Sequence, residues 1–371
     1  MKIYFRFFSF FCLISLLSFG NCFGQRIYEN SIKRFKYSNL DSLFTEIVKS
    51  KETTIGIAII DLKDSQRWSK NYSNDNLTDS LGNRNDINFP TMSVYKFHLA
   101  LAILKEVDKG KFNLNDELFI TKNDLLEETY SPLRNDLKKE YGEGYEEKIK
   151  NGVSIKLTEL LSYMVSKSDN NACDILFRLL GGKEYIKIRK KKSKNKFSET
   201  QIVEVRIKYN QKGVERLNHF IKKLGLKNTS ISASEEKMHE SFDNQYLNTT
   251  TPLDAVSLLK HFYQGKILKK ETQDFLWKIM VETQTGNNKI KAGLPQDEKI
   301  ILGHKTGSSF RKKAKEGEEF GLKAAENDIG IVITPTKKYA VAIFIKNSTE
   351  SNEVNAALIA ELSKIIYEYL D

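Results

Sequence analysis

The sequence predicts a mixed α/β (α+β) protein. Its core is one antiparallel sheet built from both ends of the chain, flanked by terminal helices and interrupted by an all-helical lobe. Residues 54–62 (TIGIAIIDL) form a short, apolar and β-branched run, which is typical of a buried strand. Residues 328–334 and 339–346 form two more such runs around a proline-containing turn, as in a hairpin. Because strands from both ends enclose a long middle segment, a single sheet with a second lobe inserted is the most economical arrangement.

The spacing of apolar residues indicates where the helices lie. Apolar residues recur three and four positions apart, which buries one face of a helix. The runs with this spacing cover residues 40–48, 97–107, 157–168, 172–180, 254–262, 271–281 and 352–370. We therefore expect a sheet lobe at about 25–85 and 285–371 and a helical lobe at about 86–284.

Residues 184–213 depart from the helical pattern of the middle segment. Ile186 and Ile188 alternate with charged residues, and a period of two returns from Val203 to Tyr209. Since a period of two is that of a strand, this segment predicts a projecting β-hairpin insertion. Its lysine-rich tip, residues 190–196, is either a solvated turn or an arm that binds a partner.

The first 24 residues predict a secretory signal peptide. Lys2 and Arg6 precede an apolar run at residues 7–19, which is shorter than the roughly 20 residues needed to span a membrane. Cleavage near residue 24 leaves residues 25–371 as a periplasmic domain with no stable membrane insertion. Cys22 raises the alternative of a lipid anchor, which Asn21 disfavours because such processing expects a small residue at that position.

Composition limits the partners and cofactors. The net charge of +11 comes from scattered lysines with few interleaved aromatic residues, so we expect solvated surfaces and no nucleic-acid partner. The five histidines show no metal-ligand spacing, and we expect no metal or other cofactor. Only Cys173 remains after signal cleavage, which leaves no internal disulfide. We expect a monomer.

One short motif suggests nucleophilic chemistry. Ser93 and Lys96 follow Pro90 in an S-x-x-K spacing at the start of a predicted helix. Positions three apart share a helix face, so the amine can approach the hydroxyl. Serine needs a neighbour that takes its proton, and burial lowers the pKa of a lysine toward that role. Alone, the spacing also fits a solvated pair.

Two further motifs give the first one a context. Ser168, Asp169 and Asn170 form S-D-N between two predicted helices, and Lys305 begins K-T-G after a strand-like run at residues 299–302. The three motifs occur in the order and roles known for class A β-lactamases and penicillin-binding proteins, in which the serine of S-x-x-K is the nucleophile.

From residue 89 to the C-terminus, the sequence resembles a class A serine β-lactamase, in particular the PER-type and related cephalosporinases of Bacteroidetes-like bacteria. The stretches that carry the resemblance are SVYKFHLA, SKSDNNACD, LWKIMVETQTG, GHKTGS and ENDIGIVI. The resemblance implies a β-lactamase/penicillin-binding-protein-like fold. It also implies hydrolysis of cephalosporins and penicillins through an acyl-enzyme, with a β-lactam as the small-molecule partner.

The resemblance also implies a role for each catalytic residue. Ser93 attacks the lactam carbonyl, while Lys96 and Glu235 share the removal of its proton. Ser168 passes a proton to the leaving nitrogen, and backbone N–H groups of Ser93 and Ser308 hold the oxyanion. Glu235 then activates the water that cleaves the ester. Substrate contacts are implied for Asn170, Lys305, Thr306, Gly307, Ser308, Tyr130 and His239.

Several positions leave alternatives open. Residues 234–248 resemble the Ω-loop of that branch, with Glu236 as the second choice for the base and His239 as either a site or a loop-packing residue. Lys289 stands where PER-type enzymes carry arginine, and Arg311 is a substitute cation; the charged loop 310–322 is longer than usual. A D-alanyl-D-alanine peptidase or penicillin-binding protein, or a non-catalytic envelope-binding protein, are the alternative functions. Glu235 favours the lactamase.

Overall fold

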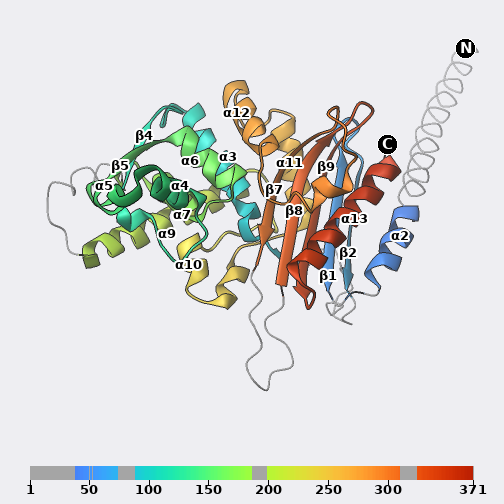
Figure 1. Ribbon diagram of the computed structural model, residues 1–371. Coiled ribbons are helices and arrows are strands. Elements are labelled where there is room, and N and C mark those ends of the chain that lie inside the picture. Colours follow the sequence, from blue (N-terminus) through green and yellow to red (C-terminus); the bar gives the residue numbers. More distant parts are fainter. Residues whose placement is uncertain are drawn as a thin grey trace, which may run out of the picture. The chain divides into compact units, whose positions relative to one another are not determined.

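The computed structural model describes residues 38–49, 51, 53–73, 88–185, 199–309 and 324–370. The chain divides into two compact units, residues 1–50 and 51–371 (Figure 1). The described part of the first unit is one helix, α2 (Ser38–Val48). The second unit holds the sheet and the helical lobe. The expected signal peptide, the basic tip 190–196, Arg311 and the loop 310–322 lie outside the described residues.

The sheet confirms the predicted architecture, because its strands come from both ends of the chain. All neighbouring strands are antiparallel, in the order β2-β1-β9-β8-β7. They are β2 (Arg67–Ser73), β1 (Thr54–Asp61), β9 (Lys338–Ser348), β8 (Ala324–Ile333) and β7 (Ile301–Ser308). β1 is buried along its whole length and β9 over most of it, as their apolar sequences require. β2 was not predicted, because an edge strand with one wet face has a polar sequence.

Helices cover the sheet and fill the second lobe. α13 (Asn352–Leu370) packs on β8 and β9 and crosses the front of the sheet in Figure 1, whereas α11 (Pro252–Tyr263) packs on β1, β8 and β9. α12 (Lys270–Val281) packs against β7 and links the sheet to the helical lobe. These helices lie where the apolar spacing predicted them.

The helical lobe is built around α3 (Tyr95–Asp108), which is buried from Tyr95 to Leu104. α6 (Leu157–Ser166), α7 (Asn170–Gly181) and α9 (Glu199–Lys223) pack around it, together with α12. The remaining described elements of the second unit are short: β3 (Phe89–Pro90), η2 (Met92–Val94), β4 (Glu117–Ile120), η3 (Lys122–Asp124), α4 (Pro132–Tyr141), η4 (Gly142–Gly144), α5 (Tyr145–Asn151), β5 (Val153–Lys156), α10 (Glu235–His239), η5 (Phe242–Leu247), β6 (Thr249–Thr250) and η6 (Ile290–Gly293), which packs on α13.

The predicted β-hairpin over residues 184–213 is wrong in its described part. Residues 199–223 form the single helix α9, and Val203 and Ile207 point to solvent. The inner face of α9 carries the buried residues Arg206, Tyr209, Asn210 and Leu217, at helical spacing. Glycine allows α9 to approach α7 closely, because a Cβ at Gly213 would lie 2.2 Å from the Phe177 carbonyl oxygen. Since two of the inward residues are polar, the apolar pattern alone suggested a strand.

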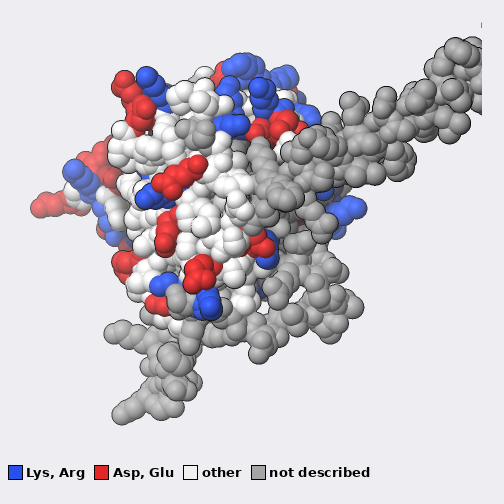
Figure 2. All heavy atoms as spheres, turned by 90° about the vertical axis from the view of Figure 1, so that its right-hand side faces the viewer, with Lys and Arg blue, Asp and Glu red and all other residues white. Residues whose placement is uncertain are grey.

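Charged side chains are mixed on the surface. Figure 2 shows described Lys and Arg residues lying among Asp and Glu residues and broad uncharged areas on one face. Within the described part of the chain, no helix has both the length and the apolar character needed to cross a membrane.

Candidate active site

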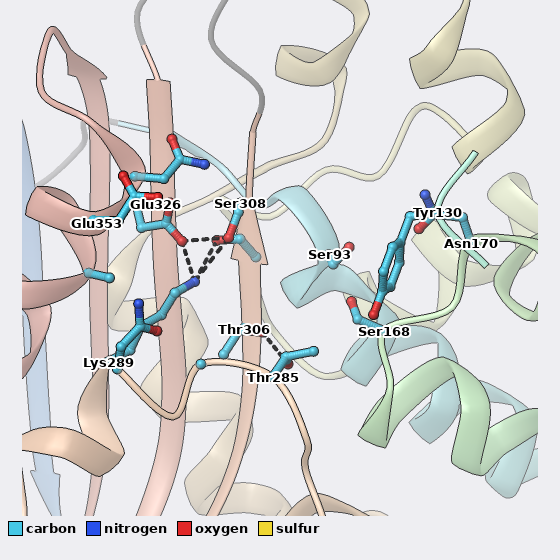
Figure 3. Close-up of a pocket in the computed structure, with 15 residues that line it drawn as sticks. Ser93, Tyr130, Ser168, Asn170, Thr285, Lys289, Thr306, Ser308, Glu326 and Glu353 are labelled. Carbon is cyan, nitrogen blue, oxygen red and sulfur yellow. Dashed lines mark hydrogen bonds and ion pairs between the residues drawn. The ribbon is translucent and has the colours of Figure 1, made fainter. Parts of the chain in front are cut away.

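The three sequence motifs meet at one cavity of about 350 Å³ within the second unit (Figure 3). Ser93 lies in the middle of the view, the S-D-N residues lie on one side and β7 lies on the other. The residues of the motifs that line the cavity are Ser93, Ser168, Asn170, Thr306, Gly307 and Ser308, joined by Tyr130. Segments far apart in the sequence therefore converge on one space, with half-exposed Tyr130 at its edge.

Ser93 is held at the junction of the two lobes. It lies in η2, one turn before the core of α3, and it is partly exposed. Asn327 of β8 donates hydrogen bonds to the carbonyl oxygens of Pro90 (2.8 Å) and Thr91 (3.2 Å), which fixes the entry to this turn. A Cβ at Gly307 would lie only 3.0 Å from the Ser93 nitrogen. The K-T-G glycine thus permits β7 to approach the serine backbone.

Lys96 lies one helical turn beyond Ser93 and is fully buried. Its ammonium donates to the Ser168 carbonyl oxygen (2.8 Å) and to Asn170 Oδ1, and it lies 3.0 Å from Glu235 Oε1. A buried ammonium is tolerated only when it is paired and hydrogen-bonded. The S-x-x-K and S-D-N motifs and Glu235 are therefore joined through one nitrogen atom.

The structure distinguishes the two neighbouring glutamates at the start of α10. Glu235 is buried and points toward Lys96, and its Oε1 also accepts a hydrogen bond from the Tyr95 hydroxyl (2.9 Å). Glu236 points the other way, where it pairs with Arg206 and accepts from Asn210 Nδ2 (3.2 Å). Of the two, only Glu235 can act on a group next to Lys96.

Asp174 holds this turn in place. Its two carboxylate oxygens accept the backbone N–H groups of Glu235 and Glu236, each at 2.8 Å. The pKa of Asp174 is raised to about 7, chiefly by burial; Arg178 lowers it, and Glu235 and Glu236 add to the rise. The sequence analysis assigned no role to Asp174, although its position four residues after Asn170 on α7 was a signal that it faces the same site.

Tyr95 and Cys173 lie behind Glu235. The two side chains lie 3.3 Å apart, from the tyrosine oxygen to the cysteine Sγ. Burial raises the pKa of Tyr95 well above its ordinary value, and the neighbouring Cys173 and Glu235 raise it further. Tyr95 therefore remains a hydrogen-bond donor to Glu235 at neutral pH. Burial likewise raises the pKa of the Cys173 thiol, so Cys173 is not a nucleophile.

The S-D-N turn has a strained backbone that its neighbours stabilise. Ser168 has φ of 59°, in the left-handed region that costs a non-glycine residue about 1–3 kcal/mol. Asp169 caps α7 by accepting from the Ala172 N–H (2.7 Å), and it also accepts from the Leu133 N–H (2.7 Å) and Ser131 Oγ (2.9 Å). Desolvation of this buried carboxyl raises its pKa. These bonds fix the turn that presents Ser168.

Lys305 joins Ser168 to β7. Its ammonium donates to Ser168 Oγ at 2.9 Å and is fully buried directly behind the cavity lining. Burial lowers the pKa of Lys305 well below its ordinary value, and the cations Lys96 and Lys289 lower it further. A lysine that loses its proton readily beside a serine hydroxyl is suited to a proton relay.

Three of the predicted substrate contacts have partners within the protein. His239 does not line the cavity that contains Ser93. It lies beside a second cavity of about 410 Å³, donates from Nδ1 to the Glu235 carbonyl oxygen (2.7 Å) and has Nε2 3.3 Å from Thr129 Oγ1. Asn170 Nδ2 donates to the same Thr129 oxygen (2.8 Å). Thr306 Oγ1 lies 2.6 Å from Thr285 Oγ1, which orients its hydroxyl at the cavity wall.

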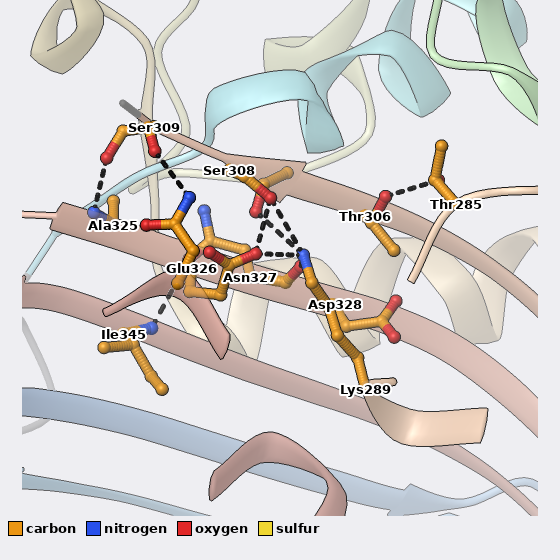
Figure 4. A network of polar contacts seen from close by, with 12 residues as sticks. Thr285, Lys289, Thr306, Ser308, Ser309, Ala325, Glu326, Asn327, Asp328 and Ile345 are labelled. Atoms are coloured by element: carbon orange, nitrogen blue, oxygen red, sulfur yellow. Dashed lines mark hydrogen bonds and ion pairs between the residues drawn. The ribbon is translucent and has the colours of Figure 1, made fainter. Parts of the chain in front are cut away.

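Sequence reasoning left Lys289 uncertain and did not identify Glu326. Both are buried and form an ion pair at the end of the cavity opposite Asn170 (Figures 3 and 4). Lys289 Nζ also donates to Ser308 Oγ (3.1 Å), and Ser308 donates to Glu326 Oε1. Glu326 faces Ser308 directly across the β7–β8 ladder, so only the strand register could have identified it.

Comparisons with known proteins agree with the geometry. The chain matches the beta-lactamase enzyme family over residues 39–212 and 207–370. It is similar to beta-lactamase VEB-1 of Pseudomonas aeruginosa, with 33% identity over 95% of this chain and 96% of the relative. Extended-spectrum beta-lactamase PER-1 of the same organism is 32% identical over 91% of each chain.

Solved structures give the same result. The crystal structure of TLA-1 extended-spectrum beta-lactamase has 34% identity and a TM-score of 0.69, covering 90% of this chain and 98% of that chain. A class A beta-lactamase from Bacteroides cellulosilyticus has 33% identity and the same TM-score and coverage. The likeness therefore extends over both lobes of the second unit.

Proposed function

The chain belongs to the β-lactamase enzyme family, among the class A enzymes of the PER and Bacteroidetes group, and from this premise we propose that it hydrolyses cephalosporins and penicillins through an acyl-enzyme on Ser93. A β-lactamase confers resistance to β-lactam antibiotics by opening the lactam ring. The observation that carries the proposed mechanism is the buried Lys96–Glu235 pair, 3.0 Å apart. Lys96 also bonds Ser168 and Asn170, which line the cavity that contains Ser93, whereas Glu235 lines the second cavity.

Acylation begins at Ser93. Its Oγ attacks the lactam carbonyl carbon, and the proton passes to Lys96 or, through a water, to Glu235. Backbone N–H groups of Ser93 and Ser308 hold the oxyanion. As the C–N bond breaks, Ser168 gives its proton to the lactam nitrogen and recovers one through Lys305, which lies 2.9 Å from its hydroxyl.

Deacylation depends on Glu235. Its carboxylate removes a proton from a water, which attacks the ester carbonyl and releases Ser93 Oγ. The hydrogen bonds from Tyr95 and Lys96 hold the carboxylate in place, and Asp174 holds its backbone. This step separates a hydrolase from a penicillin-binding protein that remains acylated.

Substrate contacts follow from the remaining cavity lining. Asn170 is placed to hydrogen-bond the side-chain amide of the β-lactam. Thr306 and Ser308, with Lys305 behind them, receive the carboxylate of the fused ring, because a carboxylate calls for hydroxyl donors and a cation. Tyr130 lines the entrance.

The direct test of this mechanism is Ser93→Ala. The variant should fold normally, fail to hydrolyse a chromogenic cephalosporin and show no mass increase on incubation with a penicillin. The parent protein should show turnover. Covalent labelling that survives in Ser93→Ala would assign the nucleophile to another residue.

We further propose that the protein is exported to the periplasm as a monomer after removal of residues 1–24. The support is the pattern of Lys2, Arg6 and the apolar run at residues 7–19. Intact mass of protein from the periplasmic fraction should correspond to a chain that begins at residue 25, and light scattering should give the mass of one chain. A diacylglycerol adduct on Cys22 would instead indicate a lipoprotein.

A further inference from the structure

The end of the cavity opposite Asn170 carries charges that the proposed mechanism does not use. This end is lined by Lys289, directly before η6, by Glu326 of β8 and by Glu353 in the first turn of α13 (Figure 3). Lys289 and Glu326 are buried and paired, whereas Glu353 is exposed. The three side chains together carry a net charge of −1, although this end is next to the hydroxyls proposed to bind an anion.

Ser308 is engaged by both members of the buried pair. Its hydroxyl accepts from Lys289 Nζ at 3.1 Å and donates its only proton to Glu326 Oε1. A serine hydroxyl has one proton, so it cannot donate to Glu326 and to a ligand carboxylate at once. Ser308 is exposed toward the cavity, which makes this competition direct (Figure 4).

Lys289 is engaged in the same way. Besides Glu326 and Ser308, its ammonium contacts the carbonyl oxygens of Gly307 (3.4 Å) and Asn327 (3.2 Å). Its three protons therefore already have four acceptors within the described residues. A ligand carboxylate would have to displace one of them, and Glu326 would repel it at short range.

We propose that Glu326 is a specificity-determining residue, which competes with the ring carboxylate of the β-lactam for the Ser308 hydroxyl and the Lys289 ammonium. This inference rests on the proposed function. Its consequence is that Lys289 contributes little to the attraction of the substrate carboxylate while Glu326 remains paired with it. The parent enzyme should then prefer a ligand with a free carboxylate over its ester less strongly than a variant without the Glu326 charge.

The test compares one chromogenic cephalosporin with its methyl ester, which lacks the negative charge. Glu326→Gln keeps the shape and removes the charge, so kcat/KM for the acid relative to the ester should rise about five- to twenty-fold. A ratio that stays the same or falls would overturn the inference. If the parent hydrolyses neither compound, the proposed function itself fails, and the two failures remain distinct.

Two further variants separate electrostatics from structural damage. Adding Lys289→Met to Glu326→Gln should abolish the rise in the acid-to-ester ratio, because that rise depends on the Lys289 ammonium that Glu326→Gln releases. Glu353→Gln, at an exposed position, should raise the acid-to-ester ratio about two-fold. Glu361→Gln on the exposed face of α13 is its matched control. Equal effects of Glu353→Gln and Glu361→Gln, or a gain that persists in the double variant, would contradict the assignment.

Discussion

Two buried Lys–Glu pairs lie at opposite ends of the active-site region, and they differ in what surrounds them. Side-chain exposure is 0% and 6% for Lys96 and Glu235, and 5% and 2% for Lys289 and Glu326. Burial therefore does not distinguish them. Lys96 and Glu235 have separate further partners, in Ser168 and Tyr95, whereas Lys289 and Glu326 share the hydroxyl of Ser308.

The difference shows that a buried ion pair does not by itself indicate proton transfer. Glu235 keeps its carboxylate between Lys96 and a fixed donor, with its backbone held by Asp174. A water that enters there meets a positioned base. Glu326 instead neutralises a cation and occupies a hydroxyl, so its effect is on which ligand binds. The variants below are expected to respond differently for this reason.

The largest effect is expected for Glu235→Gln. Loss of the base should slow deacylation by about 10²- to 10⁴-fold while acylation through Lys96 continues, because general bases contribute in that range. An acyl-enzyme should then accumulate and be visible by intact mass within one turnover of a cephalosporin.

Glu236→Gln is the matched control, since Glu236 points toward Arg206 on α9. It should change the deacylation rate by less than about three-fold. Unchanged turnover in Glu235→Gln, with loss of turnover in Glu236→Gln, would show that the roles of the two glutamates are reversed.

Breaking the Lys289–Glu326 pair should lower the free energy of unfolding. Lys289→Met leaves Glu326 buried without its cation, which typically destabilises a protein by about 3–5 kcal/mol. Urea unfolding should show this loss, and Glu326→Gln added to Lys289→Met should recover most of it, because no buried charge then remains. A single variant as stable as the parent would mean that Glu326 is not charged in the folded state.

Sequence identified the first pair more readily than the second for a physical reason. Local spacing indicated Lys96, which lies one helical turn after Ser93, and the resemblance of residues 234–248 to an Ω-loop implied Glu235. Lys289 and Glu326 come together only through the sheet, where Glu326 pairs with Ser308. The connection between β7 and β8 is long, and no local rule fixes the register that it produces.

Local sequence patterns also explain which parts of the fold were predicted correctly and which were not. The sheet from both chain ends was predictable because β1, the second half of β8 and most of β9 are apolar runs. α9 was missed because its buried face includes Arg206 and Asn210, which a hydrophobic pattern counts as exposed. The same two polar residues contact Glu236 of α10, next to the proposed base, so a hydrophobic pattern misses residues that matter for the site.

A pH-dependent effect is expected for Asp174→Asn. The folded-state pKa of Asp174 is about 7, above the ordinary value of 3.8, so the folded protein binds more protons than the unfolded chain between these values. Asp174 therefore destabilises the fold increasingly as pH rises from 4 to 7, by about 1.4 kcal/mol per unit at most. Relative to Asp174→Asn, the parent should lose stability over this range.

Urea unfolding of both proteins at several pH values measures this difference. Subtracting the two curves cancels the groups that they share, which leaves Asp174 and its coupling to Glu235, Glu236 and Arg178. A difference that does not change between pH 4 and 7 would place the pKa of Asp174 near its ordinary value. Asparagine can accept only one of the two N–H groups, so a slower deacylation is also expected.

The smallest effect should come from the contact between α9 and the turn that carries Glu235. Arg206 of α9 donates to the Asn123 carbonyl oxygen (3.1 Å) and pairs with Glu236, directly after the base. Arg206→Met should slow deacylation about three-fold and reduce the free energy of unfolding by about 1–2 kcal/mol, and Arg206→Lys should restore part of both. If acylation slows as much as deacylation, α9 stabilises the lobe in general. If only deacylation slows, the α9 contact serves the Lys96–Glu235 end of the site and contributes to holding the base in place.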